Sequence, residues 1–287
     1  MRPIDGKAVV ITGAASGIGR ALAREMAQRG ARLLLADVDA QRLGLVAAEL
    51  RAQGAPCHDM ITDVGDEAAV YALAERAAQL FGAADLVINN AGVSLVAPVH
   101  KLATADAHWL MDINFWGVVH GCRAFLPQLQ TRPQALLVNV SSIFAMVSVP
   151  TQSMYNASKA AVRGFSDALR EELRDTPVRV LCVHPGGIRT DIARRARVTD
   201  VSMVADTVER MHEDFEQTAR TSPQQAARAI VKAIERGSTR VLVGADARVL
   251  DMLYRIAPTR ASAWLTALGA WMRRRRARRL AANGPRA

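Results

Sequence analysis

Short aliphatic runs alternate with longer segments of helical periodicity over the first 190 residues, and this alternation constrains the fold more than any other feature. Six runs are predicted to be buried strands, the third being the weakest: Ala8–Ile11, Arg32–Ala36, Cys57–Ile61, Asp85–Ile88, Leu136–Val140 and Val178–Val183. The segments between them are predicted to be helices: Gly17–Arg29, Ala40–Gln53, Glu67–Phe81, Ala105–Gln130 and Ser153–Asp175. A sheet built in this way is parallel and carries helices on both faces.

A seventh strand, Arg240–Val243, follows a helix that Ser222-Pro223 can open and Gly237 can close. The predicted fold class is therefore α/β, a doubly wound domain with a seven-stranded, mostly parallel sheet. No repeat or low-complexity linker divides the chain, so we predict one domain over residues 1–250 and a helical, basic extension over residues 251–287. Residues 190–222, rich in Arg, Met and Val, are predicted to form a lid or insertion near the mouth of the site.

Composition narrows the class of protein further. Half of the residues are hydrophobic and 22% are charged, which is typical of a soluble globular protein. The three cysteines are far apart and the six histidines show no metal-binding spacing, so neither a disulfide framework nor a metal site is predicted. The N-terminus has no apolar signal-peptide core and no stretch is long enough to span a membrane, so the expected location is the cytoplasm.

The net charge of +10 is mostly a property of the tail. Residues 270–287 hold seven arginines and no acid, which leaves +3 for the rest of the chain, and no nucleic-acid partner is predicted. Trp264, Leu268, Trp271 and Met272 have helical spacing and precede six arginines in seven residues. Two interpretations stay open: a segment resting peripherally on an anionic membrane surface, or one packed on the body or a neighbouring subunit with its arginines solvated.

A glycine cluster joins the first predicted strand to the first predicted helix, in the order Thr12-Gly13-Ala-Ala-Ser-Gly17-Ile-Gly19. Glycines at this point let a pyrophosphate approach the backbone and rest on the positive N-terminal end of the helix. The alternative is an ordinary tight turn, because the spacing is G-x-x-x-G-x-G rather than G-x-G-x-x-G.

Asp37 closes the second strand, 18 residues after Gly19, and favours the dinucleotide interpretation. A carboxylate there can accept hydrogen bonds from the adenosine ribose hydroxyls and would repel a 2′-phosphate. Neither Ser16 nor Val38 offers a cation for such a phosphate, so NAD(H) is favoured over NADP(H). Arg20 is the main reservation, although in the first turn of a helix it is expected to face solvent.

Tyr155 stands four residues before Lys159, in a chain with only 4 lysines against 33 arginines. Free tyrosine, with a pKa of about 10, is too weak a base at neutral pH to take the proton of an alcohol. A cation one helical turn away lies on the same face and favours the phenolate. A compact ammonium can also donate to ribose hydroxyls, and Ser142, at the end of a strand, can hydrogen-bond a substrate oxygen.

Six landmarks occur in a fixed order: Thr12–Gly19, Asn89-Asn90-Ala91-Gly92, Asn114, Ser142, Tyr155-x-x-x-Lys159 and Pro185-Gly186. In this order and over residues 5–250, the chain resembles the short-chain dehydrogenase/reductase family in its single-domain form. The resemblance implies a Rossmann-like fold and an NAD(P)-dependent oxidoreductase acting on CH–OH groups. It also implies a homodimer or homotetramer formed through the two long helices, Ala105–Gln130 and Ser153–Asp175.

The resemblance further implies roles for individual residues. The catalytic set is Asn114, Ser142, Tyr155 and Lys159, with Ser142 preferred to Ser141 by the family's spacing. Asn114 would hold a water that links Lys159 to solvent; the alternative is an ordinary polar helix residue. The cofactor-binding set is Gly13, Ser16, Gly17, Ile18, Gly19, Asp37, Asp63, Val64, Asn90, Ala91, Gly92, Tyr155, Lys159, Pro185, Gly186, Ile188 and Thr190.

Within the cofactor-binding set, Asp63-Val64 would hold the adenine ring, with a helix-capping aspartate as the alternative. Gly92 would leave room for a ribose, while Ile188 and Thr190 would meet the carboxamide and the phosphates. His184 is interpreted as a structural residue rather than a base, because the family varies at the position before Pro-Gly.

The predicted substrate site contains Ser142, Phe144, Val149, Tyr155 and Gly187. Further predicted lining residues are Val93, Ser94, Leu95, Ala145, Met203, Met211 and Phe215. This set is mostly apolar and favours a hydrophobic secondary alcohol or ketone as substrate.

The leading functional hypothesis is an NAD(H)-dependent oxidoreductase that interconverts a hydrophobic secondary alcohol and its ketone. The alternatives are a non-catalytic nucleotide-sensing protein and an NADP(H)-dependent ketoreductase. The complete Ser142, Tyr155 and Lys159 set disfavours a sensor, which needs the glycine loop but no activated tyrosine. The family's larger epimerase and dehydratase branch is disfavoured by the chain length and the glycine spacing.

Overall fold

Seven parallel strands form one sheet in the computed structural model, which describes the backbone of residues 4–282 and the side chains of residues 4–271. The strand order is β3-β2-β1-β4-β6-β7-β9, and every neighbouring pair is parallel. The strands are β1 Ala8–Thr12, β2 Arg32–Asp37, β3 Cys57–Ile61, β4 Leu86–Asn89, β6 Ala135–Val140, β7 Val178–Pro185 and β9 Arg240–Val243. The predicted seven-stranded Rossmann-like sheet is confirmed, and it is parallel throughout.

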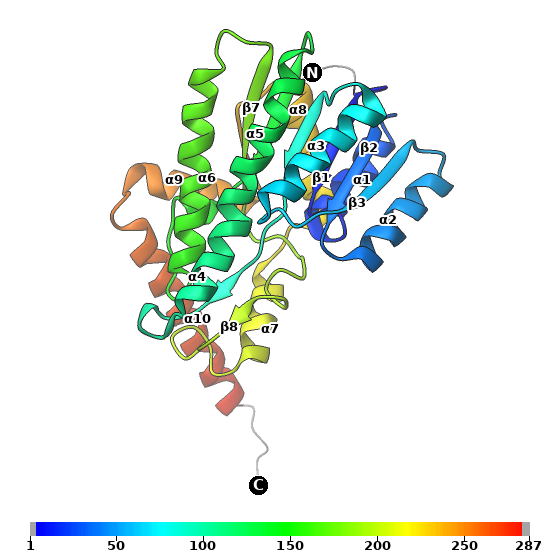
Figure 1. Ribbon diagram of the computed structural model, residues 1–287. Coiled ribbons are helices and arrows are strands. Elements are labelled where there is room, and N and C mark those ends of the chain that lie inside the picture. Colours follow the sequence, from blue (N-terminus) through cyan, green and yellow to red (C-terminus); the bar gives the residue numbers. More distant parts are fainter. Residues whose placement is uncertain (1–3, 283–287) are drawn as a thin grey trace.

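Helices cover both faces of the sheet (Figure 1). One layer contains α1 Gly17–Ala27, α2 Ala40–Ala52 and α8 Pro223–Arg236, and the other contains α3 Glu67–Phe81, α5 Gly117–Gln130 and α6 Ser153–Glu172. The alternation of side chains along each strand divides the core between them: Val9 and Ile11 pack toward α1 and α8, and Val10 packs toward α3 and α5. Both halves of the core are aliphatic, as expected for strands buried on both faces.

The order of the strands reverses between β1 and β4. The chain runs from β1 outward through β2 and β3, and then returns to β4 on the other side of β1. In a doubly wound sheet, ligands bind outside the carboxyl ends of the strands at such a reversal. The loops after Thr12, Asn89, Val140 and Pro185 therefore converge on the region where a site is expected.

The helix α8 follows the capping pattern read from the sequence. Ser222 accepts a hydrogen bond from the Gln225 backbone N–H, and the Gln225 side chain accepts one from the Ser222 N–H, which completes a capping box. Gly237 ends the helix in the left-handed conformation at φ +69°. The predicted start and end of this helix are confirmed.

The prediction of one regular helix over Ala105–Gln130 is wrong in one respect, because a π-helical turn interrupts the α-helix. The structure has α4 Thr104–Met111, one π-helical turn at Asp112–Trp116, and then α5 without a break. A π turn inserts one extra residue and is common at functional sites. Here the wide turn carries Asn114, whose side chain bonds the backbone of Val93.

The predicted lid contains more regular structure than its sequence suggests. The short strand β8 Arg197–Val198 pairs in parallel with β5 Leu95–Val96, and α7 Val208–Thr218 follows it. Ion pairs attach this segment to the loop after β5 and to α4, because Lys101 pairs with Asp200 at 2.5 Å and Arg197 pairs with Asp106 of α4 at 2.6 Å. The Arg197 guanidinium also lies 3.7 Å from the centre of the Trp109 ring.

Two further helices, α9 Ala245–Ile256 and α10 Ala261–Ala282, follow β9. The side chains of Met272 and of the arginines after it, which belong to the predicted tail, lie outside the described residues. Within the described part of the chain, no helix combines the length and the hydropathy needed to cross a bilayer.

Candidate active site

The glycine cluster forms a tight turn between β1 and α1. Gly13 has φ +66°, and a Cβ atom there would lie 2.8 Å from the Cα of Ala91. A Cβ atom on Gly19 would lie 2.0 Å from the carbonyl oxygen of Gly13. Both positions therefore exclude a side chain, and the turn presents bare backbone at the end of β1.

The N-terminus of α1 differs from those of α2, α3, α7 and α8. Ser16 occupies the N-cap position but makes no side-chain capping hydrogen bond. By contrast, Asp39, Asp66, Thr207 and Ser222 each cap their own helix through a side-chain oxygen. The first turn of α1 thus keeps its N–H groups uncapped by Ser16, an arrangement that fits a bound pyrophosphate.

Asp37 lies at the end of β2 beside this turn. Its carboxylate accepts hydrogen bonds from the backbone N–H of Ala15 at 2.9 Å and of Asp39 at 3.0 Å. These bonds fix the carboxylate and leave further acceptor positions on both oxygens. Arg20 is exposed. The hydrogen bond from Arg24 is the main cause that lowers the pKa of Glu49 on α2, and the charge of Arg20 lowers this pKa further.

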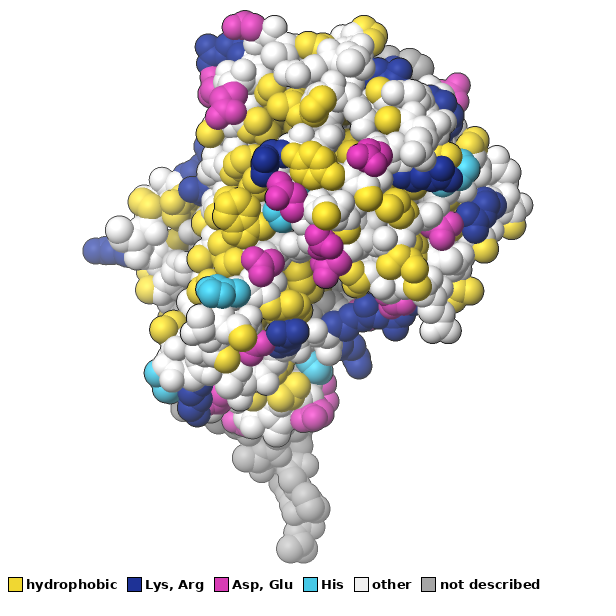
Figure 2. Space-filling model, in the orientation of Figure 1, with side chains coloured by type: hydrophobic (Ala, Val, Ile, Leu, Met, Phe, Trp, Pro, Cys, Tyr) yellow, Lys and Arg dark blue, Asp and Glu magenta, His cyan; other side chains and the backbone are white. Residues whose placement is uncertain are grey.

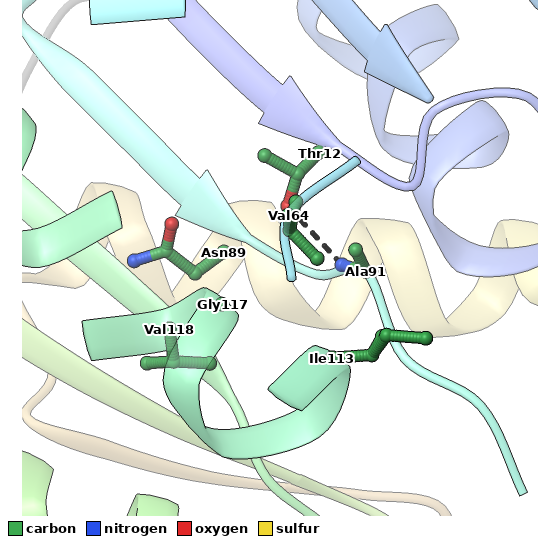
Figure 3. Close-up of a pocket in the computed structure, with 7 residues that line it drawn as sticks. All are labelled: Thr12, Val64, Asn89, Ala91, Ile113, Gly117 and Val118. Atoms are coloured by element: carbon green, nitrogen blue, oxygen red, sulfur yellow. Dashed lines mark hydrogen bonds between the residues drawn. The ribbon is translucent and has the colours of Figure 1, made fainter. Parts of the chain in front are cut away.

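The segment Asn90-Ala91-Gly92 is held to β1 by hydrogen bonds. The Thr12 hydroxyl accepts from the N–H of Asn90 at 3.1 Å and of Ala91 at 3.2 Å, and the Asn90 amide donates to the Thr12 carbonyl at 2.9 Å. Figure 3 shows the Thr12–Ala91 bond. The two loops that flank the strand reversal are therefore one connected unit.

A shallow pocket with no room for a water molecule lies against this unit (Figure 3). It is lined by Thr12, Val64, Asn89, Ala91, Ile113, Gly117 and Val118. None of these residues belongs to the predicted catalytic set, so the pocket is part of the frame under the cofactor loops. Val64 lines it because Gly117 has no side chain: a Cβ there would lie 2.7 Å from Val64 Cγ2.

The structure brings Ser142, Tyr155 and Lys159 together. Ser142 follows β6; its hydroxyl accepts from the Phe144 N–H at 3.1 Å and lies near enough to the Tyr155 phenol to lower its pKa. One turn along α6, Lys159 Nζ donates to the Val140 carbonyl at 3.1 Å and lies 5.9 Å from the centre of the Tyr155 ring. The end of one strand and the first two turns of one helix thus supply a hydroxyl, a phenol and an ammonium group.

The expectation that Lys159 holds the pKa of Tyr155 below its ordinary value is not met in this structure. Burial raises the pKa of the Tyr155 phenol, and the hydrogen bond from Ser142 opposes that change only in part. Burial also lowers the pKa of Lys159 to about 8, because the ammonium is removed from water. At neutral pH the phenol keeps its proton, and Lys159 is mostly charged.

Asn114 is fully buried and anchors the loop after β4. Its amide donates to the Val93 carbonyl at 3.0 Å and to Ser158 Oγ at 3.2 Å, while its oxygen accepts from the Val93 N–H at 2.8 Å. Gly92 separates Asn114 from Lys159: a Cβ atom on Gly92 would lie 3.2 Å from Asn114 Oδ1 and 3.3 Å from Lys159 Nζ. The predicted water relay stays a prediction, but the side chains of Asn114 and Lys159 both lie next to Gly92.

The loop after β7 reaches back to the glycine turn. Gly17 approaches Thr190 so closely that a Cβ atom would lie 3.1 Å from Thr190 Cγ2. Gly187 donates its N–H to Asp246 at 2.6 Å, and Gly186 packs on the same carboxylate. Ile188 is buried. Thr190 is therefore adjacent to the predicted phosphate-binding loop, as the sequence predicts.

The predicted substrate residues do not all gather at one place. Phe144 packs edge-on against Tyr155 with ring centres 6.3 Å apart, and Val93 and Leu95 lie in the same apolar cluster as Tyr155. Met211 instead packs with Val96. The remaining predicted residues are exposed, half-buried or buried without a described contact to Tyr155: Ser94, Ala145, Val149, Met203 and Phe215.

Asp63 is exposed, and its carboxylate accepts from the Gly65 N–H at 2.9 Å. Asp66, three residues later, caps α3. The alternative interpretation of Asp63 as a helix cap is therefore wrong, and its predicted role beside an adenine ring stays open.

His184, interpreted from the sequence as structural rather than as a base, is buried with its Nδ1 3.3 Å from the Ser142 carbonyl oxygen, and burial lowers its pKa to about 4. Sequence reasoning missed two other residues that hold the site in place. Ser141, set aside in favour of Ser142, donates to the Lys159 carbonyl at 2.7 Å and ties β6 to α6. Asp246 comes from α9, some 60 residues from Gly187 in sequence. Only the Ser141–Ser142 pair gave a hint in the sequence.

Comparison with known proteins agrees with this geometry. The family model described as short chain dehydrogenase matches residues 7–201. SadH of Mycobacterium tuberculosis, named an oxidoreductase, is 42% identical over 259 residues, covering 89% of this chain and 92% of SadH. The 1-deoxy-11-beta-hydroxypentalenate dehydrogenase of Streptomyces avermitilis is 40% identical over 189 residues, covering 64% of this chain and 70% of that protein.

A short-chain dehydrogenase/reductase from Burkholderia phymatum, solved in complex with NAD, has a TM-score of 0.81 and 32% identity, covering 90% of this chain and 98% of that one. The chain belongs to the short-chain dehydrogenase/reductase family. It is an oxidoreductase that uses NAD(P).

Proposed function

We propose that the protein is an NAD(H)-dependent dehydrogenase that interconverts an apolar secondary alcohol and its ketone, with Tyr155 as the acid/base. The observation that carries this proposal is the placement of the buried Ser142 and Lys159 beside Tyr155, with the Lys159 ammonium 5.9 Å from the centre of the phenol ring. A phenol in this setting can exchange a proton with a substrate oxygen held by the same hydroxyl.

When bound, a nicotinamide cofactor would supply the hydride chemistry, and the positive charge of its oxidised ring would favour the Tyr155 phenolate. The residues of this chain handle the proton. In alcohol oxidation, Tyr155 in its phenolate form takes the hydroxyl proton and becomes the phenol as the C=O bond forms, while Ser142 donates a hydrogen bond to the substrate oxygen. In ketone reduction, Tyr155 returns that proton to the developing alkoxide.

Lys159 supports both directions from beneath the phenol. Its ammonium is fixed by the Val140 carbonyl, and Gly92 leaves space beside it for Asn114 and for a ribose hydroxyl. A guanidinium is larger and planar and would not fit between these groups, which explains a lysine in an arginine-rich chain.

Asp37 supports the choice of NAD(H) over NADP(H). Its carboxylate is fixed at the end of β2 by two backbone N–H groups, and Arg20 faces solvent near Glu49. A 2′-phosphate would meet the negative charge of Asp37 at this place, and the neighbouring guanidiniums of Arg42 and Arg195 are paired with Asp39. The NAD bound to the Burkholderia phymatum relative agrees with this preference.

An apolar substrate is supported by the surroundings of Tyr155. Phe144, Val93, Leu95 and Met154 lie around the phenol ring, and none of them is charged. The Streptomyces avermitilis relative is named as a dehydrogenase of a hydroxylated compound.

The test is a screen of apolar secondary alcohols and their ketones, with NAD and NADP tested in parallel and NADH absorbance as readout. The expected result is turnover of at least one such alcohol with NAD, and none by a Tyr155→Phe variant. Turnover of sugars or hydroxy acids alone would contradict the substrate class, and a higher rate with NADP would contradict the cofactor choice.

We also propose that the chain forms a homodimer or homotetramer through α5 and α6. Hydrophobic side chains gather over these helices in Figure 2, and Trp116, on the π turn, is 46% exposed. Trp116 contacts Phe115, which in turn packs against Phe165 of α6. Sedimentation velocity is expected to show an oligomer that Trp116→Glu dissociates; a monomeric parent protein would contradict this assignment.

A further inference from the structure

The start of helix α10 packs on the body of the molecule. Ala261 and Leu265 pack with α9 on the segment after Ser142, residues 143–147. Ser262 Oγ accepts a hydrogen bond from the Ser148 N–H at 2.9 Å. The start of α10 is therefore fixed to the segment that joins Ser142 to Tyr155.

The exposed side of α10 is apolar. Trp264 is 45% exposed, Leu268 51% and Trp271 54%. Their spacing of four and then three residues places them on one face of the helix. We call these three residues the tryptophan face. In Figure 1, α10 runs out beyond the α/β body at the end of the molecule where β8 and α7 lie.

The charge of the chain is concentrated in the same segment. Residues 252–287 contain nine arginines and no acid, so they account for nine of the ten net positive charges. Six of these arginines follow the tryptophan face directly, at positions 273–276, 278 and 279.

Three occupants could cover an apolar face of this kind, and the charge distinguishes them. A second copy of the chain would bring two clusters of arginines together, which like-charge repulsion disfavours. Nucleic acid would satisfy the arginines but would leave Leu268 exposed to a polar backbone. An anionic bilayer satisfies both parts: tryptophan and leucine enter the interface, and arginine pairs with the headgroups.

We propose that the tryptophan face and the arginines at 273–279 bind the surface of an anionic lipid bilayer. Each of the two elements alone gives weak, reversible binding, and together they anchor the protein peripherally. Because the start of α10 packs on residues 143–147, the anchored protein holds the segment next to Ser142 and Tyr155 close to the lipid. The binding itself does not depend on the substrate or on the proposed function.

The test is co-sedimentation of the full chain with vesicles of phosphatidylcholine alone and with vesicles that also contain phosphatidylglycerol. The expected result is binding to the anionic vesicles at low salt and roughly 100-fold weaker binding to the neutral ones. A variant with glutamine at all six arginines, 273–276, 278 and 279, is expected to bind the anionic vesicles roughly 100-fold more weakly than the parent protein does. The double variant Trp264→Ser, Leu268→Ser is expected to bind about tenfold more weakly than the parent.

Two matched controls separate this proposal from general effects. Replacing the same six arginines by lysine keeps the charge and is expected to keep the binding. Replacing Leu45 and Val99 by serine removes exposed apolar side chains elsewhere, 66% and 69% exposed, and is expected to leave the binding unchanged. Thermal unfolding of every variant shows whether the fold is intact, and the glutamine variant tests the proposal even if the double serine variant is unstable.

Several outcomes would overturn the proposal. These are equal sedimentation with neutral and anionic vesicles, no sedimentation with either, or full binding by the glutamine variant. Loss of binding by the lysine variant would exclude a charge-based lipid contact. Dissociation of an oligomer by the double serine variant, without vesicle binding by the parent, would identify the face as a subunit interface. Tighter binding of an oligonucleotide than of anionic vesicles would assign the arginines to nucleic acid.

Discussion

The cofactor end of the site presents mainly backbone atoms, whereas the reacting end presents side chains. The glycine turn after β1 presents backbone, because Gly13 and Gly19 exclude side chains and Ser16 does not cap α1. The end formed by β6 and α6 presents side chains: Ser142 and Lys159 are buried, and burial raises the pKa of the Tyr155 phenol.

The difference follows from what each end does. A pyrophosphate is recognised by backbone N–H groups, which every residue except proline carries. The cofactor end therefore needs space around its backbone more than it needs particular side chains. A proton transfer needs one phenol with a suitable pKa, and the reacting end therefore depends on individual side chains. A variant at one end is expected to leave the other end working.

The replacement Tyr155→Phe gives the sharpest separation of the two ends. Loss of the acid/base group is expected to lower kcat roughly 10³-fold, about 4 kcal/mol in the barrier. The dissociation constant for NADH, measured by fluorescence titration, is expected to change by less than about twofold, since the glycine turn and Asp37 are untouched. Activity near the parent level would remove Tyr155 from the chemistry, and loss of NADH binding would show that the two ends are not independent.

The reacting end is also expected to lose stability in acid through His184. Its folded pKa of about 4 lies below the ordinary value near 6.5, so the unfolded chain binds a proton that the folded chain refuses. The contribution of His184 is complete above pH 6.5 and is lost as the pH falls toward 4, by about 2 kcal/mol between pH 7.5 and 5. Urea unfolding of the parent and of His184→Gln at these two pH values measures it. An equal loss of stability in both proteins would assign the acid sensitivity to other groups.

At the cofactor end, Asp37→Ala is expected to change the choice of cofactor while leaving the chemistry intact. Removing the carboxylate takes away the acceptor for ribose hydroxyls and the repulsion of a 2′-phosphate. We expect NAD to bind about tenfold more weakly and the preference over NADP to narrow, with kcat at saturating NAD within about threefold of the parent. Parallel kcat/KM measurements with NAD and NADP check this, and an unchanged ratio would refute the role of Asp37 in discrimination.

The sequence predicted the strands and most helix limits, because these depend on local patterns. Gly13 and Gly19 are required by a turn of a few residues, and Tyr155 and Lys159 lie one helical turn apart. Contacts between distant segments could not be predicted in this way. Asp246 reaches Gly187 from α9, and the π turn at Asn114 depends on the backbone of Val93, more than 20 residues earlier. The pKa of Tyr155 also depends on burial, which no spacing reveals.

The smallest predicted effect compares two serines at the starts of neighbouring helices. Ser222 caps α8 within a complete capping box, whereas Ser16 at the start of α1 makes no capping bond. Replacing Ser222 by alanine is therefore expected to lower the free energy of unfolding by about 1 kcal/mol, and replacing Ser16 by alanine by no more than a few tenths. Denaturant unfolding of both variants without cofactor measures this difference.

For NADH affinity we expect the reverse order: Ser16→Ala weakens NADH binding more than Ser222→Ala does, since Ser16 lies in the glycine turn and Ser222 does not. Equal losses of stability in the two variants would mean that Ser16 does cap α1 in solution, and the first turn of that helix would then be less open to a pyrophosphate.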